Sequence, residues 1–316
     1  MSGRSSLAAA LLVVPLLAGP GCTTPDASAE PPDARASSVT TAEVTLLEAG
    51  SAPRTPLRLH PKKGDTLSSV LTMEVGMSTA SVGTEPKMPR ARVARIRLAT
   101  EVAHVTPDGA FRCDYTVRGL SMNPDPDIPP QEAGEIQDKL DAMEGLSGFT
   151  VFDSRGVARQ SGVNPPETAI APEVKQRFDD AMHSLDQICR PFPEEPVGVG
   201  ARWKVEQSFS TNGMRIHQTT TCTLTALDAN GLTLAIALKQ SAPEQDVVSP
   251  DSPSAKVRLL CFESSGEGEL QSSLDRVMPS RGSLTMGSDF QLKSIGDDAP
   301  QTLAVKMNIK LSIRSE

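Results

Sequence analysis

Hydrophobic and polar residues alternate along much of the chain, most regularly near its end. Between residues 303 and 313 every second side chain is apolar, and similar runs occupy 67–77, 94–102, 232–238 and 284–292. A period of two is typical of strands that place one face on a core and the other in water, as antiparallel sheets do. The pattern predicts a mainly β (α+β) fold, a long curved antiparallel sheet of half-barrel-like form.

Turn sequences separate several of these runs. The segments TPDG at residues 106–109 and DANG at 228–231 each lie between two alternating stretches. Pro-Asp-Gly and Asn-Gly are frequent in tight turns because Gly and Asn tolerate positive φ angles. Each segment therefore predicts a hairpin. The runs on either side indicate strands of ten residues or more, which must twist and curl when they share a sheet.

Two stretches in the middle of the chain have a helical period instead. Residues 172–188 place six apolar side chains on one stripe and begin with Pro172, a residue suited to a first helical turn. Residues 131–144 carry a shorter stripe of Ile136, Leu140 and Met143. We expect both helices to pack on the apolar face of the sheet, as a central insertion that spans residues 130–188 in a single domain, 44–316.

The strand groups on either side of this insertion resemble each other. Each begins with a glycine, Gly64 or Gly200, and continues through a strand, a loop, an Arg-Ile pair, a second strand, a glycine turn and a third strand. A duplication explains the likeness, and so does the general form of a three-stranded meander. The second explanation needs no further assumption.

The N-terminus has the organisation of an export signal. Arg4 precedes an apolar run of twelve residues, too short to span a bilayer, and the run ends shortly before Cys22. We interpret residues 1–21 as a signal peptide, Cys22 as a lipidated cysteine and 22–43, rich in Pro, Ala and Ser, as a disordered tether. The alternative is an ordinary signal peptide in which Cys22 has no role. In enteric bacteria the residue that follows the lipidated cysteine directs a lipoprotein to one of the two membranes. Because Thr23 and not Asp follows Cys22, resemblance to that sorting rule implies the outer membrane as the location of the protein.

Four further cysteines fit an exported protein. Cys113 has the same strand parity as the apolar and aromatic residues around it, which are typical of a core. Cys189 follows the apolar stripe of the helix predicted at 172–188. We expect a Cys113–Cys189 bridge between helix and sheet and a Cys222–Cys261 bridge between strands. Buried thiols are the alternative.

Composition and motifs exclude several functions. The net charge of −8 and the lack of a Lys/Arg cluster exclude nucleic acid as a partner. The sequence contains no HExxH, GxSxG, GxxxxGK[ST] or GxGxxG motif, so we expect no catalytic residues, no metal ligands and no cofactor. The glycine-rich segment 264–268 has neither the lysine nor the following helix of a phosphate-binding loop, and a bulged strand or a turn is the better interpretation.

Two segments carry a family resemblance. LLEAGSAPR at residues 46–54, followed by PLRL at 56–59 and by Gly64, resembles the entry segment of uncharacterised exported lipoproteins of Gram-negative bacteria. FPEEPVGVGARW at residues 192–203 is similar to the motif that opens the second half of that family. The resemblance covers residues 44–316 and implies no activity. In architecture alone, the predicted order of strands and helices resembles the half-barrels of periplasmic lipoprotein carriers and lipid-binding lipoproteins.

Methionines on the apolar strand faces suggest a ligand. Copper-handling proteins use exposed Met clusters, but here no His is adjacent, and filling of the core is the simpler explanation. Two helices leave part of the apolar sheet surface uncovered. The sheet must then close on itself, be covered by loops such as 123–130 and 243–253, or hold an apolar guest. Closure into a filled barrel needs bulky interior side chains, and the chain has few aromatic residues. The candidate lining of a ligand site is Met73, Met77, Leu98, Met286 and Met307.

Three classes of function remain open. The first is a lipid-anchored, non-enzymatic module of the cell envelope that binds a lipid or another apolar ligand. The second is an envelope structural or interaction lipoprotein with an unidentified protein partner and no small ligand. A hydrolase is the remote third.

Overall fold

The computed structural model describes residues 42–81, 91–123, 130–164, 191–211, 213–229, 231–249, 252–295 and 301–316. Thirteen strands and one helix follow one another in these ranges. They are β1 (Glu43–Glu48), β2 (Thr66–Ser81), β3 (Arg92–Val105), β4 (Phe111–Met122), α1 (Pro130–Asp141), β5 (Ser147–Phe152), β6 (Ala158–Asn164), β7 (Arg202–Thr211), β8 (Met214–Asp228), β9 (Gly231–Ala242), β10 (Gln245–Ser249), β11 (Ser252–Ser272), β12 (Arg281–Ser294) and β13 (Thr302–Ser315).

All of the strands belong to one antiparallel sheet. Their order is β1-β7-β8-β9-β11-β12-β13-β2-β3-β4-β5-β6, and β10 pairs with the first part of β11. The path ends at β1 and at β6, so the sheet is not closed by strand pairing among the described residues. Its central junction joins β13, the last strand of the chain, to β2, near the start of the described chain, with Met307 opposite Met77. The prediction of a mainly β fold with one long antiparallel sheet is confirmed.

The strands are long, as their alternation predicted. The run 303–313 forms most of β13, and β2 has 16 residues. The TPDG segment turns the chain between β3 and β4, where Gly109 has a φ of 83°, and β8 meets β9 at residues 228–231. Segment 264–268 lies within β11, a strand of 21 residues with a bulge between Leu259 and Cys261.

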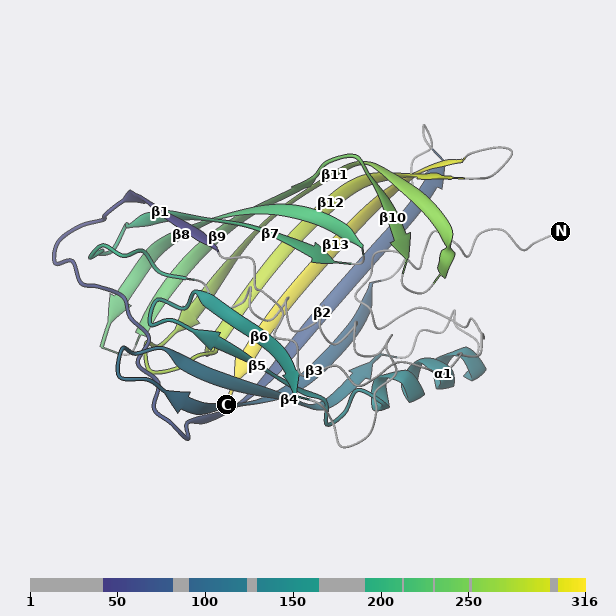
Figure 1. Cartoon of the computed structure of the whole chain (residues 1–316). Helices are drawn as coiled ribbons and strands as arrows, with labels where there is room; N and C mark the ends of the chain where they lie inside the picture. The colour runs from purple at the N-terminus through teal and green to yellow at the C-terminus, as the bar shows by residue number, and fades with distance from the viewer. Residues whose placement is uncertain are drawn as a thin grey trace, which may run out of the picture.

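The sheet curls, so that its two ends face each other (Figure 1). Buried residues from β3 to β5 and from β7 to β9 meet in one hydrophobic cluster, which we call the base cluster. A smaller cluster, the rim cluster, forms at the other ends of the strands. It consists of Val75, Met214, Ile216, Val247, Leu259, Phe262, Phe290, Leu292, Val305 and Met307.

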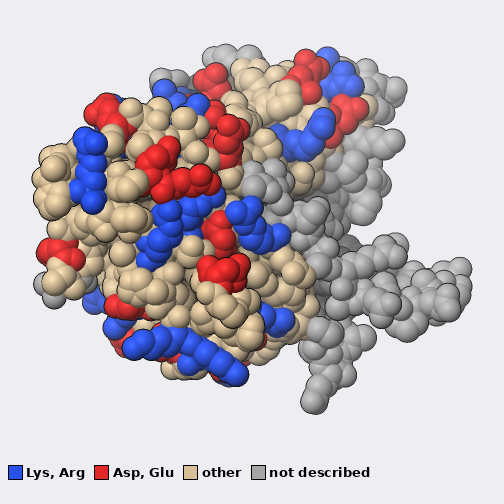
Figure 2. Space-filling view, turned by 60° about the vertical axis from the view of Figure 1, so that its left-hand side comes forward, with Lys and Arg blue, Asp and Glu red and all other residues tan. Residues whose placement is uncertain are grey.

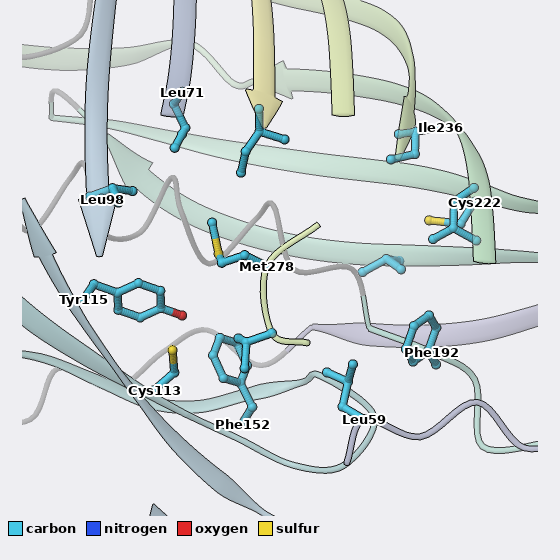
Figure 3. Packing of buried hydrophobic residues seen from close by; sticks show 14 of the residues in the cluster. Leu59, Leu71, Leu98, Cys113, Tyr115, Phe152, Phe192, Cys222, Ile236 and Met278 are labelled. Carbon is cyan, nitrogen blue, oxygen red and sulfur yellow. The ribbon is translucent and has the colours of Figure 1, made fainter. Parts of the chain in front are cut away.

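The base cluster contains the largest buried side chains. Trp203 is fully buried, donates its indole N–H to the carbonyl of Pro191 at 3.0 Å and packs edge-on against Phe192. Figure 3 shows Met278, from the β11–β12 connection, at the centre of this cluster, between side chains of opposite ends of the sheet. The connection thus acts as a plug at this end.

Two irregular segments join the sheet edges where strands do not pair. Thr55 bridges Val197, the Leu59 N–H donates to the Ser154 carbonyl, and the Phe192 N–H donates to the Arg155 carbonyl. These segments cross so closely that a Cβ on Gly198 would collide with the Ser51 carbonyl oxygen. Segments 46–59 and 192–203 therefore close the base.

The two strand groups are alike in their hydrogen bonds. Gly64 and Gly200 both have a φ of 87°. The Gly64 N–H donates to the Val102 carbonyl at 2.9 Å, and the Gly200 N–H donates to the Leu224 carbonyl at 2.7 Å. In both groups the N–H of the accepting residue donates in turn to the carbonyl of the residue after the glycine. Both groups therefore begin with the same backbone hydrogen-bond pattern around a glycine of positive φ.

The expectation of two helices on the apolar face is not borne out. Helix α1 forms where the sequence predicted it, and Ile136, Leu140 and Met143 are buried in the base cluster. Its contacts are with β4, at one end of the fold. The helix expected at 172–188 lies outside the described residues. Part of the loop at 243–253 is instead strand β10, whose Val247 is buried in the rim cluster.

The structure records no disulfide among the residues it describes. Cys222 is fully buried on the inner face of β8, whereas Cys261 is exposed on β11, and both are thiols. The expected Cys222–Cys261 bridge is therefore wrong, because the two side chains occupy opposite faces of the sheet. Cys113 is buried with Phe111 and Tyr115 as its parity predicted, but Cys189 lies outside the described residues.

Candidate ligand-binding face

The candidate site lies on the inner face of β12, β13 and β2, which run along the back of the curled sheet (Figure 1). Residues paired across strands project to the same face. Met286 is opposite Ile309, Leu284 is opposite Leu311, and Leu311 is opposite Met73. Six half-buried side chains of this face form what we call the methionine patch. They are Met73, Met77, Leu284, Met286, Ile309 and Leu311.

The middle of the patch packs against neither cluster. Met73, Met77 and Ile309 contact the rim cluster, but Leu284, Met286 and Leu311 belong to neither set of packed residues. Beside them, β11 contributes no side chain at Gly266 and Gly268, which pair with Met286 and Leu284. A Cβ on either glycine would collide with backbone of β12, so the close approach of the two strands requires glycine here.

The structure brings together four of the five predicted lining residues. Met73, Met77, Met286 and Met307 lie on the inner face of three adjacent strands, with Met307 buried at the border of the rim cluster. Leu98 is 2% exposed and belongs to the base cluster. It therefore lies apart from the patch, although its strand parity is the same.

Sequence analysis missed a line of polar side chains on the same inner face. Gln218, Gln240, Ser264 and Ser288 are successive cross-strand partners on β8, β9, β11 and β12, and we call them the polar row. Gln218 is fully buried, and Ser264 and Ser288 are 6% and 3% exposed. The signal was available, because each residue replaces an apolar one at an inner position of an alternating or glycine-rich strand.

Hydrogen bonds connect the polar row in pairs. Gln240 Nε2 donates to Gln218 Oε1 at 2.7 Å, and Ser288 Oγ donates to Ser264 Oγ at 2.9 Å. Gln218 Nε2 also reaches Thr220 Oγ1 at 3.4 Å. On β8 and β9 the row lies between residues of the rim cluster and residues of the base cluster.

The outer face differs sharply from the inner one. Figure 2 shows basic and acidic side chains interspersed over the visible face, and Lys306 and Asp289 form an exposed cross-strand pair at 3.3 Å. Exposed ion pairs of this kind contribute little to the stability of the folded protein. Two hollows of about 630 and 490 Å³ open on the outer face, and each is lined by charges of both signs, including Arg281 with Glu269 and Arg118 with Asp114. Neither hollow favours one class of ligand.

Titratable groups do not form a catalytic constellation in the described parts of the chain. His60 Nδ1 lies 2.7 Å from Asp275 Oδ1, but both side chains are exposed. Hydrogen bonds from the Thr106 side chain and from backbone N–H groups hold the pKa of Asp108 below its usual value, in the exposed β3–β4 turn. A hydrogen bond to Asp246 raises the pKa of Arg258. Within the described ranges, no three His, Cys, Asp or Glu side chains are placed to hold a metal ion.

The segments predicted to direct the protein to a membrane are not part of the described structure. Cys22, the signal peptide and nearly all of the tether precede residue 42. Over the ranges that the structure covers, no helix has the length and apolar character needed to cross a membrane.

Comparison with known proteins gives little. No protein-family model and no curated protein sequence matches the chain. A mutant of the Rh. blastica porin aligns with 78% of this chain and 100% of its own, at 10% identity and a TM-score of 0.21. A loop-deletion variant of OmpT, an outer membrane protein of Vibrio cholerae, covers 79% and 99% at 7% identity and a TM-score of 0.16. Likeness at these TM-scores carries no argument, and the lipoprotein resemblance gains no support.

Proposed function

We propose that this protein is a non-enzymatic binding module of the cell envelope that takes a lipid or another apolar ligand on its inner face. One observation carries the proposal. Leu284, Met286 and Leu311 are adjacent, half-buried and packed against neither hydrophobic cluster. Methionine and aliphatic side chains adapt to ligands of irregular shape better than rigid aromatic rings do.

The free energy available from the patch is substantial. Fully burying one aliphatic or methionine side chain is worth roughly 1.5–3 kcal/mol. Covering the exposed part of six such side chains is then worth on the order of 3 kcal/mol, before the costs of immobilising the ligand. A ligand with a long acyl or alkyl chain supplies the apolar surface that this requires.

Uptake of pyrene-labelled long-chain probes tests the proposal. Met286→Asp places a charge in the middle of the patch and should abolish uptake while circular dichroism retains the strand signal. Thr285→Asp is the matched control, because Thr285 is the exposed neighbour on the outer face of the same strand. We expect this control to bind as the wild type does.

Failure of the wild type to take up any probe would overturn the proposal. An envelope interaction protein without a small ligand would then be the better account. Equal loss of uptake in the two Asp variants would show that a charge on β12 acts through the fold and not through the patch.

We further propose that Cys22 carries a lipid that holds the domain on a membrane, in our view the outer membrane. The position of Cys22 after a short apolar run and before a Pro/Ala/Ser-rich segment supports this. Cys22→Ser should move the protein from the membrane fraction to the soluble fraction of its host. If the variant sediments with membranes as the wild type does, the anchor is not at Cys22.

A further inference from the structure

The polar row adjoins the methionine patch directly. On β12, Ser288 lies two residues from Met286 and projects to the same face. On β11, Ser264 lies two residues from Gly266, which is opposite Met286. A ligand chain that covers Met286 therefore ends beside hydroxyl and carboxamide groups rather than beside more apolar surface.

Two neighbouring members of the row keep hydrogen-bonding capacity. Gln240 uses its Nε2 on Gln218, and its Oε1 accepts no hydrogen bond from the described residues. Ser264 accepts a bond from Ser288, and its own hydroxyl proton has no acceptor in the described structure. Gln240 and Ser264 are direct cross-strand partners. One acceptor and one donor thus lie side by side at the end of the patch.

This pair matches an uncharged head group. A hydroxyl or an amide both donates and accepts a hydrogen bond, whereas a carboxylate or a phosphate dianion only accepts. None of the described inner positions of β8, β9, β11 and β12 carries a charged side chain. An anionic head group would lose its hydration here without gaining a counter-charge, which is unfavourable.

We propose that the ligand of this face is an uncharged amphiphile. Its apolar chain lies on the methionine patch, and its hydroxyl or amide head group donates to Gln240 Oε1 and accepts from the Ser264 hydroxyl. This inference rests on the proposed function and narrows it from apolar ligands in general to neutral, hydrogen-bonding ones.

Three fluorescent probes with the same ten-carbon chain test the inference on the full chain: 1-pyrenedecanol, 1-pyrenedecanoate and 1-decylpyrene. At pH 7.5 the decanoate is ionised. We expect the alcohol to bind about tenfold more tightly than either of the others, the effect of one to two hydrogen bonds. Gln240→Met, which keeps the side-chain length, and Ser264→Ala should each reduce this preference to about threefold or less.

The control is Ser265→Ala, an exposed neighbour on the opposite face of β11, which should leave the preference unchanged. Circular dichroism of every variant establishes that it folds. If all three probes bind equally, or if the decanoate binds most tightly, this inference is overturned while the proposed function stands. If no probe binds to the wild type, the proposed function itself fails.

Discussion

The base cluster and the methionine patch lie on the same inner face of the same sheet, yet they differ in what packs against them. At the base, residues from opposite ends of the sheet meet, and large rigid side chains such as Trp203, Tyr115 and Phe152 are at most 1% exposed. In the patch, aliphatic and methionine side chains remain half-buried. Among the described residues, crossing segments and the β11–β12 connection cover the strands at the base and not at the patch, so the strands alone do not complete the core.

Among substitutions that test this difference between the base cluster and the methionine patch, we expect the largest effect at Trp203. Trp203→Ala removes a fully buried ring, its contact with Phe192 and its hydrogen bond to Pro191. We expect a loss of about 3–5 kcal/mol in the free energy of unfolding. Urea unfolding measures this loss. Circular dichroism follows the transition, because the variant lacks the only tryptophan and therefore has no tryptophan fluorescence. A loss below about 1 kcal/mol would mean that the base cluster is not the stabilising region.

The same substitution in the two regions compares them directly. Met278 is fully buried in the base cluster, and Met286 is half-buried in the patch. Met278→Ala should cost about 2–5 kcal/mol, and Met286→Ala less than about 1.5 kcal/mol. Equal losses in urea unfolding would show that the patch is packed as tightly as the base, and the contrast would not hold.

A third test concerns the base, where the segment that contains Ser51 crosses the segment that contains Gly198. Gly198→Ala forces a Cβ against the Ser51 carbonyl oxygen, and backbone on both segments must shift. We expect a loss of about 2–3 kcal/mol. Gly134→Ala is the control, because Gly134 lies in α1 with open space around its Cα, and alanine there should stabilise the protein by about 0.5–1 kcal/mol. Thermal unfolding of both variants at one pH provides the comparison.

A small effect is expected at Asp108 in the β3–β4 turn. Its side chain is exposed to solvent, unlike the side chains of the base cluster and the methionine patch. The lowered pKa of Asp108 means that its ionised form is stabilised by folding. That contribution is present above the unfolded pKa of 3.8 and is lost as pH falls through the lower folded value. Asp108→Asn should lower the melting temperature slightly at pH 7 and have no effect near pH 2. A larger difference at the acid pH would contradict the direction of the shift.

The strands could be predicted wherever inner positions are apolar. In β13 the alternation runs without a break, and most of its length was clear from sequence. In β11 the inner positions include Ser264, Gly266 and Gly268, so the period disappears and the longest strand of the sheet was seen only as a bulged strand or turn. The close approach of β11 to β12 requires glycine at positions 266 and 268, and Ser264 is hydrogen-bonded to Ser288, so hydrophobicity does not mark these inner positions.

The site could be predicted in part for the same reason. Parity placed the methionines on the inner face, but parity says nothing about which strands are neighbours. The pairing of β13 with β2, some 230 residues apart in the sequence, brings Met307 opposite Met77. Leu98 has the same parity and lies in the base cluster, because curling of the sheet buries that end. The Cys222–Cys261 pairing failed because the register keeps the two residues apart: Cys222 pairs with Ile236 on β9, and the β11 partner of Ile236 is Gly268, seven residues from Cys261.

Native mass spectrometry of the full chain, extracted gently from its own host, tests the central claim most directly. We expect a population of the wild-type protein that carries one long-chain neutral lipid, and loss of that adduct in Met286→Asp but not in Thr285→Asp. A wild-type protein that is uniformly free of any bound lipid would contradict it.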